Sequence, residues 1–128
     1  MMASYSQTIT ESDIEAFASV SGDRNPVHLD ERYAKKSQFK GRIAHGMLTA
    51  SFFSQIFGTI IPGRGCVYVS QSLRFRKPVY IGDTIEARVT VVDVILRSRR
   101  IIFETVCIVD GEIVTDGRAE LYQPEDGQ

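Results

Sequence analysis

The sequence predicts an α+β fold in which a long antiparallel sheet wraps around one buried helix. Residues 44–63 form the most apolar stretch of the chain, and a helix that is apolar nearly all round is buried in a protein core. From Cys66 onward, apolar and polar residues alternate in successive segments, which is typical of strands. With 128 residues, 43% of them hydrophobic, the chain fits a single domain spanning residues 1–128.

The first predicted element is a short amphipathic helix in the stretch "TESDIEAFASVSG". Thr10 followed three positions later by Asp13 resembles a capping box, and apolar residues then recur at helical spacing. The helix should run from about residue 11 to residue 21. Gly22 can end it because glycine readily adopts the left-handed conformation.

The next stretch, "SGDRNPVHLD", reads as neither helix nor strand and places Asp23 and His28 on one loop. Pro26 lacks a backbone donor and restricts Asn25 to extended geometry, so this loop should be stiff. A polar helical turn is expected in "DERYAKKS".

The long apolar helix in residues 44–63 should end at Pro62 and Gly63. Polar residues interrupt it, and no basic flank follows at once, so burial in a protein core explains it better than a membrane span. Residues 66–79 read as one long strand, and the segments 82–96, 99–111 and 112–123 read as three more.

Composition narrows the function classes. The formal net charge of −1 gives no electrostatic basis for binding nucleic acid or an anionic membrane surface, so a small-molecule partner is expected. Cys66 and Cys107 lie in apolar strands without metal-ligand spacing and read as buried thiols. The N-terminus lacks the pattern of a secretory signal and "PEDGQ" is not a peroxisomal address, so a cytoplasmic location is predicted.

Three segments together, "GDRNPVHLD", "GRIAHGMLTASFFSQI" and "QSLRFRKPVYIGDT", resemble the MaoC-like dehydratases of the hot-dog fold, and most closely their (R)-specific enoyl-CoA hydratases. The resemblance covers nearly the whole chain. Its specific motif is D-x-N-P-x-H followed by a hydrophobic helix that begins with "HGM". It implies a homodimer that hydrates trans-2-enoyl-CoA to (R)-3-hydroxyacyl-CoA, with acyl-CoA as its partner and neither a metal nor a cofactor. Polyhydroxyalkanoate synthesis is a metabolic context found in the family.

The predicted catalytic residues are Asp23, His28 and Gly46. A carboxylate and an imidazole around one water suffice to move the protons of hydration, and Asp23 and His28 supply both groups. On composition alone, an ordinary turn with a structural histidine remains the alternative. By resemblance, the N–H of Gly46 binds the thioester oxygen, whereas His45 is interpreted as a structural residue that anchors the helix start through a hydrogen bond.

The predicted substrate-binding residues are Asn25, Ser54 and Phe57. Asn25 should hydrogen-bond the loop backbone, and Ser54 and Phe57 match family positions that line the end of the acyl pocket. A Phe57 ring that caps the pocket would limit the acyl group to about four to six carbons, because overpacking costs ~1–3 kcal/mol. Ordinary core packing is the alternative for Phe57.

Other functions and contacts remain open. Three other functions are alternatives to that of a hydratase. The chain could be a hot-dog acyl-CoA thioesterase, a 3-hydroxyacyl-carrier-protein dehydratase or a non-catalytic acyl-CoA-binding module. Basic residues at positions 74, 76 and 77 could meet the phosphates of coenzyme A, but a solvated strand face explains them equally.

Overall fold

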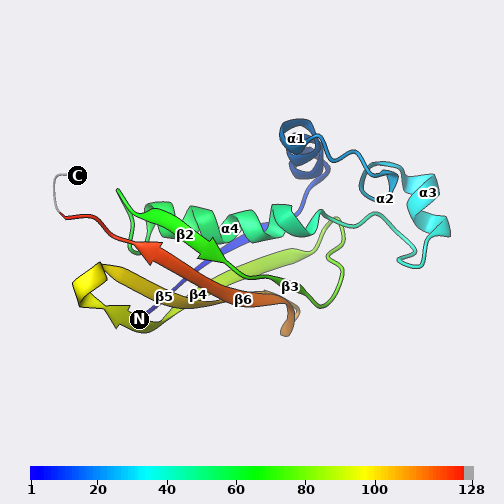
Figure 1. Cartoon of the computed structure of the whole chain (residues 1–128). Coiled ribbons are helices and arrows are strands. Elements are labelled where there is room, and N and C mark those ends of the chain that lie inside the picture. The colour runs from blue at the N-terminus through cyan, green and yellow to red at the C-terminus, as the bar shows by residue number, and fades with distance from the viewer. Residues whose placement is uncertain (126–128) are drawn as a thin grey trace.

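A computed structural model describes residues 1–125 and contains one antiparallel sheet that curves around a long helix (Figure 1). The strand order is β1-β4-β5-β6-β2, and β3 also pairs with β6. The predicted α+β hot-dog architecture is confirmed. The last three residues of the predicted 1–128 domain, and with them most of "PEDGQ", lie outside the described part. In chain order the elements are β1 (Met2–Thr8), α1 (Glu11–Ser21), α2 (Pro26–Leu29), α3 (Glu31–Lys36), α4 (Gly46–Thr59), β2 (Val67–Gln71), β3 (Arg74–Phe75), β4 (Thr84–Ile95), the 3-10 turn η1 (Leu96–Ser98), β5 (Arg100–Val109) and β6 (Glu112–Tyr122).

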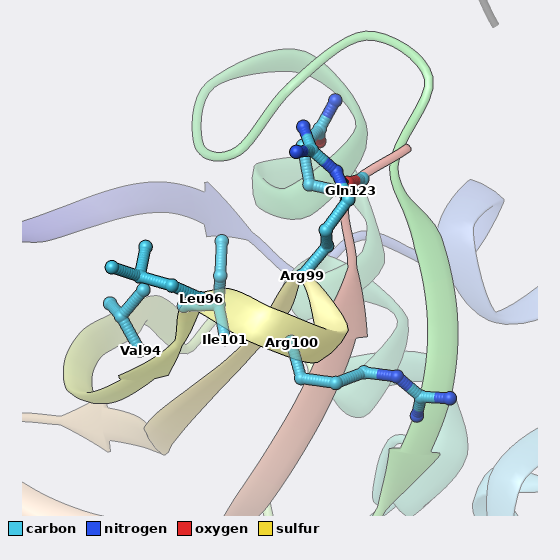
Figure 2. A pocket seen from close by; sticks show the side chains of 6 residues that line it. All are labelled: Val94, Leu96, Arg99, Arg100, Ile101 and Gln123. Carbon is cyan, nitrogen blue, oxygen red and sulfur yellow. The ribbon is translucent and has the colours of Figure 1, made fainter. Parts of the chain in front are cut away.

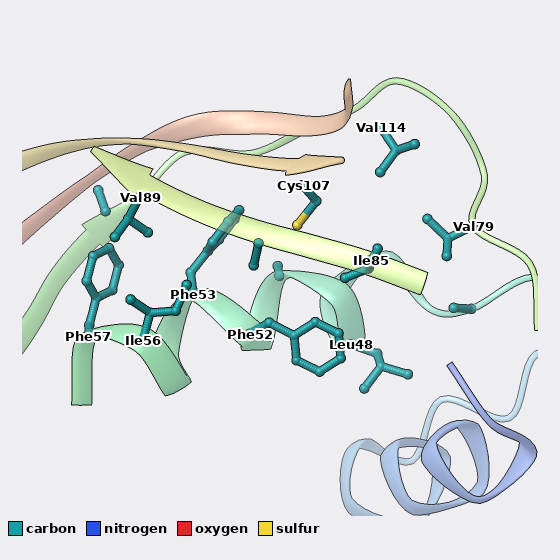
Figure 3. Close-up of a cluster of buried hydrophobic side chains, with 14 of the residues drawn as sticks. Leu48, Phe52, Phe53, Ile56, Phe57, Val79, Ile85, Val89, Cys107 and Val114 are labelled. Atoms are coloured by element: carbon teal, nitrogen blue, oxygen red, sulfur yellow. The ribbon is translucent and has the colours of Figure 1, made fainter. Parts of the chain in front are cut away.

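Helix α4 packs one apolar face on the concave side of the sheet (Figure 3). Its buried side chains meet those of β4 and β5, including Val89 and Cys107. Each large side chain buried in this way contributes roughly 1.5–3 kcal/mol. The core residues that α4 supplies are Leu48, Ala50, Phe52, Phe53, Ile56 and Phe57.

The prediction that this helix is buried all round is wrong. Only one side of α4 faces the sheet, and its other side stays exposed in the single chain, with Met47 56% exposed. The helix also ends at Thr59, three residues before Pro62. The exposed residues of α4 are Met47, Ser51, Ser54, Gln55, Gly58 and Thr59.

Helix α1 forms as its sequence predicts. Thr10 and Asp13 exchange both bonds of the capping box, and Gly22 ends the helix with a φ of 79°. The polar helical turn is α3, which begins at an Asp30 side-chain cap. These local signals succeed because each depends on neighbours within one turn of helix.

Strand β1 has no counterpart among the predicted elements. Its seven residues pair in register with β4, from Met2 opposite Thr90 to Thr8 opposite Thr84. Exposed and half-buried side chains alternate along it. The period of two was therefore present in the sequence, but the half-buried face consists of Ala3, Tyr5 and Gln7 rather than a row of large apolar residues.

The single long strand predicted for residues 66–79 is interrupted. Strand β2 ends at Gln71, and β3 resumes at Arg74 on the same neighbour, β6. At the break the carbonyl oxygen of Ser72 approaches Gly117 so closely that a Cβ atom on this glycine would lie 1.8 Å from it. This close contact between the two backbones therefore requires glycine at position 117. The alternation of residues in the predicted strand 66–79 cannot reveal such a tertiary constraint.

The three remaining predicted strands are β4, β5 and β6. The turn between β4 and β5 encloses a small cavity of about 170 Å³ (Figure 2). Two basic residues of this turn make contacts: Arg99 donates to the Gln123 carbonyl at 2.7 Å, and Arg100 pairs with Glu120. Figure 1 places this turn at the end of the sheet opposite α1 and α2. This cavity is therefore remote from the predicted catalytic loop.

Two further predictions concern the thiols and the membrane. Cys107 is buried and burial raises the pKa of its thiol to about 12, whereas Cys66 is only partly buried, with a pKa that burial also raises. Both cysteines are free. Within residues 1–125, no helix has the length and apolar character needed to cross a membrane.

Candidate active site

The loop from Ser21 to Asn25 is held by a relay of short-range hydrogen bonds. The Asp23 N–H donates to the Ser21 hydroxyl at 3.1 Å, and the Asn25 N–H donates to the Asp23 carboxylate at 3.1 Å. The Asn25 side chain in turn accepts from the Val27 N–H at 3.3 Å. The predicted hydrogen bond of Asn25 to the loop backbone is confirmed. The exposed Asp23 is thereby held next to the buried residues Val27 and His28.

The prediction that the whole segment is an irregular loop is wrong, because Pro26 to Leu29 form the helical turn α2. Proline suits the first position of a helix, where its fixed φ is already helical and no donor is lost. Asn25 caps this turn. His28 is therefore held by a short helix rather than by a loop, and only 8% of its surface is exposed.

The orientation of the His28 ring is set by a main-chain carbonyl. Its Nδ1 lies 2.8 Å from the carbonyl oxygen of Ile43. A carbonyl only accepts hydrogen bonds, so Nδ1 carries the proton in the neutral ring and Nε2 keeps a free lone pair. The Ile43 N–H also donates to the Val27 carbonyl at 3.3 Å, which ties the two segments together.

Burial lowers the pKa of His28 below its ordinary value, because the charged imidazolium loses hydration. The neighbouring His45 also lowers this pKa, whereas the Ile43 carbonyl and the Asp23 carboxylate act in the opposite direction. Burial is the largest of these effects. His28 is consequently an unprotonated imidazole at neutral pH, the state that a general base requires.

Asp23, His28 and His45 form a compact polar cluster. Each offers one oxygen or ring nitrogen, and these atoms all lie within 4.8 Å of one another. Among residues 1–125, no direct hydrogen bond joins the carboxylate of Asp23 to the ring of His28. A gap of this size accommodates one water that contacts both groups.

Three ligand atoms this close together could also hold a metal ion, but the geometry of the two histidine rings disfavours metal binding. The His28 and His45 rings are stacked, with centroids 3.9 Å apart and an interplanar angle of 27°. An ion bound to an imidazole nitrogen lies near the plane of the ring, and two nearly parallel stacked planes offer no common position. This arrangement suits proton transfer better than metal binding.

Gly46 is the first residue of α4 and lies beside this cluster in sequence. The N–H groups of Leu48 and Thr49 both donate to the His45 carbonyl, whereas none of the bonds found among residues 1–125 is donated by the Gly46 N–H. A free N–H at a helix N-terminus is a suitable donor for a developing oxyanion.

Phe75 is a residue of this region that the sequence did not identify. A Cβ atom at Gly46 would lie 2.7 Å from the Phe75 ring, so any side chain at position 46 would displace this ring. Both residues line a cavity of about 290 Å³. Only an isolated aromatic residue in a short strand marks Phe75 in the sequence, and that is too weak a signal.

Ser54 lines an apolar cavity of about 470 Å³ between α1, the exposed face of α4 and β2. Its wall includes Phe17, which also contacts the His45 ring at 4.8 Å between centroids. The cavity thus begins next to the polar cluster. Its lining consists of Phe17, Met47, Ala50, Ser51, Ser54, Tyr68, Gln71 and Leu73.

Phe57 does not share this position, contrary to the prediction that it lines the same pocket as Ser54. Its side chain is 0% exposed and packs against Phe103 with centroids 4.8 Å apart. The boundary between the two faces of α4 runs between Ser54 and Phe57. Phe57 meets the cavity only indirectly, because the Tyr68 ring that lines the cavity rests edge-on against it.

The basic residues after β2 are largely engaged with acidic partners. Arg76 pairs with Asp116 at 2.6 Å, and Lys77 pairs with Glu112. Exposed ion pairs of this kind contribute little to stability.

A family model described as "MaoC like domain" matches residues 1–113 of the chain. The chain belongs to the MaoC family. An (R)-specific enoyl-CoA hydratase from Rhodospirillum rubrum is 49% identical to it, over 98% of this chain and 87% of that protein. A 3-hydroxybutyryl-CoA dehydratase from Methylorubrum extorquens is 46% identical, over 91% of this chain and 74% of that protein.

The fold of this MaoC-family chain is similar to that of a solved (R)-hydratase from A. caviae, described as involved in PHA biosynthesis. The two superpose with a TM-score of 0.94 at 35% identity, covering 97% of this chain and 95% of the other. The resemblance inferred from the sequence motifs is thereby confirmed.

Proposed function

We propose that this protein is a hydro-lyase that reversibly and (R)-specifically adds water to the double bond of trans-2-enoyl-CoA thioesters. Two relatives support this reaction. One is named as an (R)-specific enoyl-CoA hydratase and the other as a 3-hydroxybutyryl-CoA dehydratase, which correspond to the forward and the reverse reaction. The observation that carries the proposal is the cluster of the Asp23 carboxylate with the buried His28 ring, which lie within 4.8 Å of each other, while the bond of Nδ1 to the Ile43 carbonyl leaves Nε2 of His28 as the free base.

In the proposed mechanism, one water lies between the Asp23 carboxylate and His28 Nε2. His28 takes a proton from this water while the oxygen bonds to C3 of the enoyl group. The imidazolium returns that proton to C2, so one H and one OH are added and the enzyme is restored. The Asp23 carboxylate accepts a hydrogen bond from the second O–H of the water. Its negative charge also stabilises the transient imidazolium.

Charge that develops on the thioester oxygen is stabilised by the Gly46 N–H at the start of α4. This donor is already fixed by the helix, so no reorganisation is needed when the charge appears. The acyl chain then extends into the apolar cavity that Ser54 lines. A cavity with apolar walls excludes water from the far end of the substrate.

The hydratase can be distinguished from its alternatives in one assay. Purified protein is mixed with crotonyl-CoA while the ultraviolet band of the conjugated thioester and free thiol are both recorded. We expect loss of the band without thiol release. Thiol release would instead indicate a thioesterase, and no reaction would favour a binding module.

A carrier-protein substrate is tested separately. Crotonyl groups on coenzyme A and on acyl-carrier protein are supplied together, and the proposal expects the coenzyme A thioester to be consumed with the higher kcat/KM. Preference for the carrier-protein thioester would reassign the chain to the 3-hydroxyacyl-carrier-protein dehydratases.

We also propose that the working protein is a homodimer in the cytoplasm. Strand β2 lies at an edge of the sheet beside α4 (Figure 1) and presents three consecutive exposed apolar residues, with Val69 42% exposed. An exposed apolar edge invites pairing with another strand. A second copy would pair along β2 and cover the exposed face of α4, including part of the cavity lined by Ser54.

A further inference from the structure

We propose that His45 is a positioning residue that holds Asp23, His28 and Gly46 in one fixed arrangement. This inference rests on the proposed hydratase function and gives a role in catalysis to a residue interpreted from sequence as only anchoring the helix. His45 is 2% exposed and contacts the elements that carry all three catalytic residues.

The first contact holds the loop that carries Asp23. His45 Nε2 lies 3.0 Å from the Asp23 carbonyl oxygen, and because a carbonyl only accepts, Nε2 is the donor. The other hydrogen bonds of this loop are local, made to Ser21 and Asn25. The bond from His45 is therefore the long-range tie between Asp23 and the core helix.

The second contact restrains the His28 ring. The hydrogen bond from Nδ1 to the Ile43 carbonyl fixes one atom of the His28 ring but does not by itself fix the tilt of the ring plane. Stacking on His45, with centroids 3.9 Å apart, removes that freedom and directs Nε2. Phe17 contacts the His45 ring in turn, with centroids 4.8 Å apart, so the stack is itself supported.

The third contact is covalent. The peptide bond between His45 and Gly46 contains the N–H proposed to bind the thioester oxygen. His45 caps α4 with its main chain, since its carbonyl accepts the N–H groups of Leu48 and Thr49. Any shift of the His45 backbone would thus move the oxyanion donor relative to His28.

Packing alone does not account for a histidine at this position. Its Nδ1 is buried without a hydrogen-bond partner among residues 1–125, and an unsatisfied buried polar atom costs about 1–3 kcal/mol. An apolar ring would fill the same space without that cost. The histidine is explained by its Nε2 donor together with its flat ring.

The test separates these two properties with two substitutions. His45→Phe keeps a stacking ring without a donor, and His45→Gln keeps an N–H donor without a ring. Because small misplacements of catalytic groups can cost up to about 10²-fold in rate, each variant should lower kcat by ~10- to 100-fold. KM should change by less than about threefold, since His45 itself does not line the acyl cavity.

The acid limb of the kcat/KM profile provides a second readout. The charged and titratable groups around His28 are Asp23, His45 and Arg42, whose guanidinium donates to the His28 carbonyl and pairs with Glu11. His45 is one of the influences that lower the pKa of His28. His45→Phe should therefore move the acid limb to higher pH, whereas a residue that only stabilises the fold would leave it in place.

Val89→Ala is the matched control, because it removes core packing on β4 near Phe57 at the end of α4 (Figure 3), whereas the cluster lies at the start of this helix. It should lower the melting temperature and leave kcat unchanged in the folded protein. A His45→Phe or His45→Gln variant that is folded, with kcat within about threefold of wild type and an unmoved acid limb, would overturn the positioning role. An inactive wild type would instead overturn the proposed function.

Discussion

At the scale of single residues, two main-chain carbonyls determine the chemistry of the site. Ile43 fixes the tautomer of His28, and Asp23 fixes that of His45. Neither partner could be identified from residue types, because every residue carries a carbonyl. The motif therefore predicted His28 as the base, whereas the assignment of the free nitrogen on its ring required the structure.

We predict that Asp23→Asn and His28→Ala each lower kcat by ~10²–10⁴, because His28 is the general base and acid and Asp23 orients the water and stabilises the imidazolium. The double variant should lose far less than the product of the two effects, because both groups act on one water. Steady-state kinetics, with circular dichroism to verify folding, provides the measurement. Near-wild-type turnover in either folded single variant would remove that residue from the mechanism.

The lowered pKa of His28 predicts the acid side of the pH profile. The base must be unprotonated, so kcat/KM should fall only when the pH drops through a pKa below about 6.5, the ordinary value for histidine. Plots of kcat/KM against pH in constant ionic strength measure this midpoint. A midpoint above the ordinary value would contradict burial as the dominant influence on His28.

At the scale of elements, the sequence predicted structure correctly where the signal was local. The prediction failed where a contact with a distant segment determines the structure. The capping box and Gly22 predicted α1 correctly. The break between β2 and β3 depends on Gly117, which lies 45 residues beyond Ser72. The two faces of α4 likewise depend on which side meets the sheet, and this is why Ser54 and Phe57 were assigned to one pocket.

Ser54 and Phe57 give opposite predictions for acyl-chain length. Ser54→Phe places a ring in the cavity of about 470 Å³ and should lower the kcat/KM ratio of octenoyl-CoA to crotonyl-CoA. Phe57→Ala should reduce the free energy of unfolding by about 3–5 kcal/mol, as expected for a buried phenylalanine, with little change in that ratio.

The measurements are kcat/KM values over enoyl-CoA substrates of increasing length and melting curves for both variants. The contact of Phe57 with Tyr68 leaves one route by which its loss could enlarge the cavity. A folded Phe57→Ala variant with a clearly raised octenoyl-CoA preference would restore Phe57 as the cap of the acyl pocket.

At the scale of the whole molecule, the site is assembled from segments that only the fold brings together. The Asp23 loop and the start of α4 are 22 residues apart in sequence and meet through one hydrogen bond. The family motif contains both segments, and the structure brings Asp23 and His28 of that motif together with His45 in one cluster. It contained no information on Phe75, whose packing against Gly46 depends on β3.

The two edges of the sheet differ in a way that predicts how the molecule associates. Strand β1 presents one apolar residue, Met2, with two serines and a threonine on its exposed face, whereas β2 presents three consecutive exposed apolar residues beside the open face of α4. Burial of these apolar residues by a second copy would stabilise the folded chain, so the monomer should not be the stable species.

Light scattering on the eluting protein should therefore give at least twice the chain mass of 14.3 kDa. Val69→Lys places a charge on the β2 edge and should shift the protein toward monomer, with loss of activity in proportion because the second copy also closes the acyl cavity. Ser6→Lys adds the same charge to the exposed face of β1 and should leave both mass and activity unchanged. A monodisperse, fully active wild-type monomer, or a Val69→Lys variant that remains an active dimer, would exclude β2 as the edge that pairs.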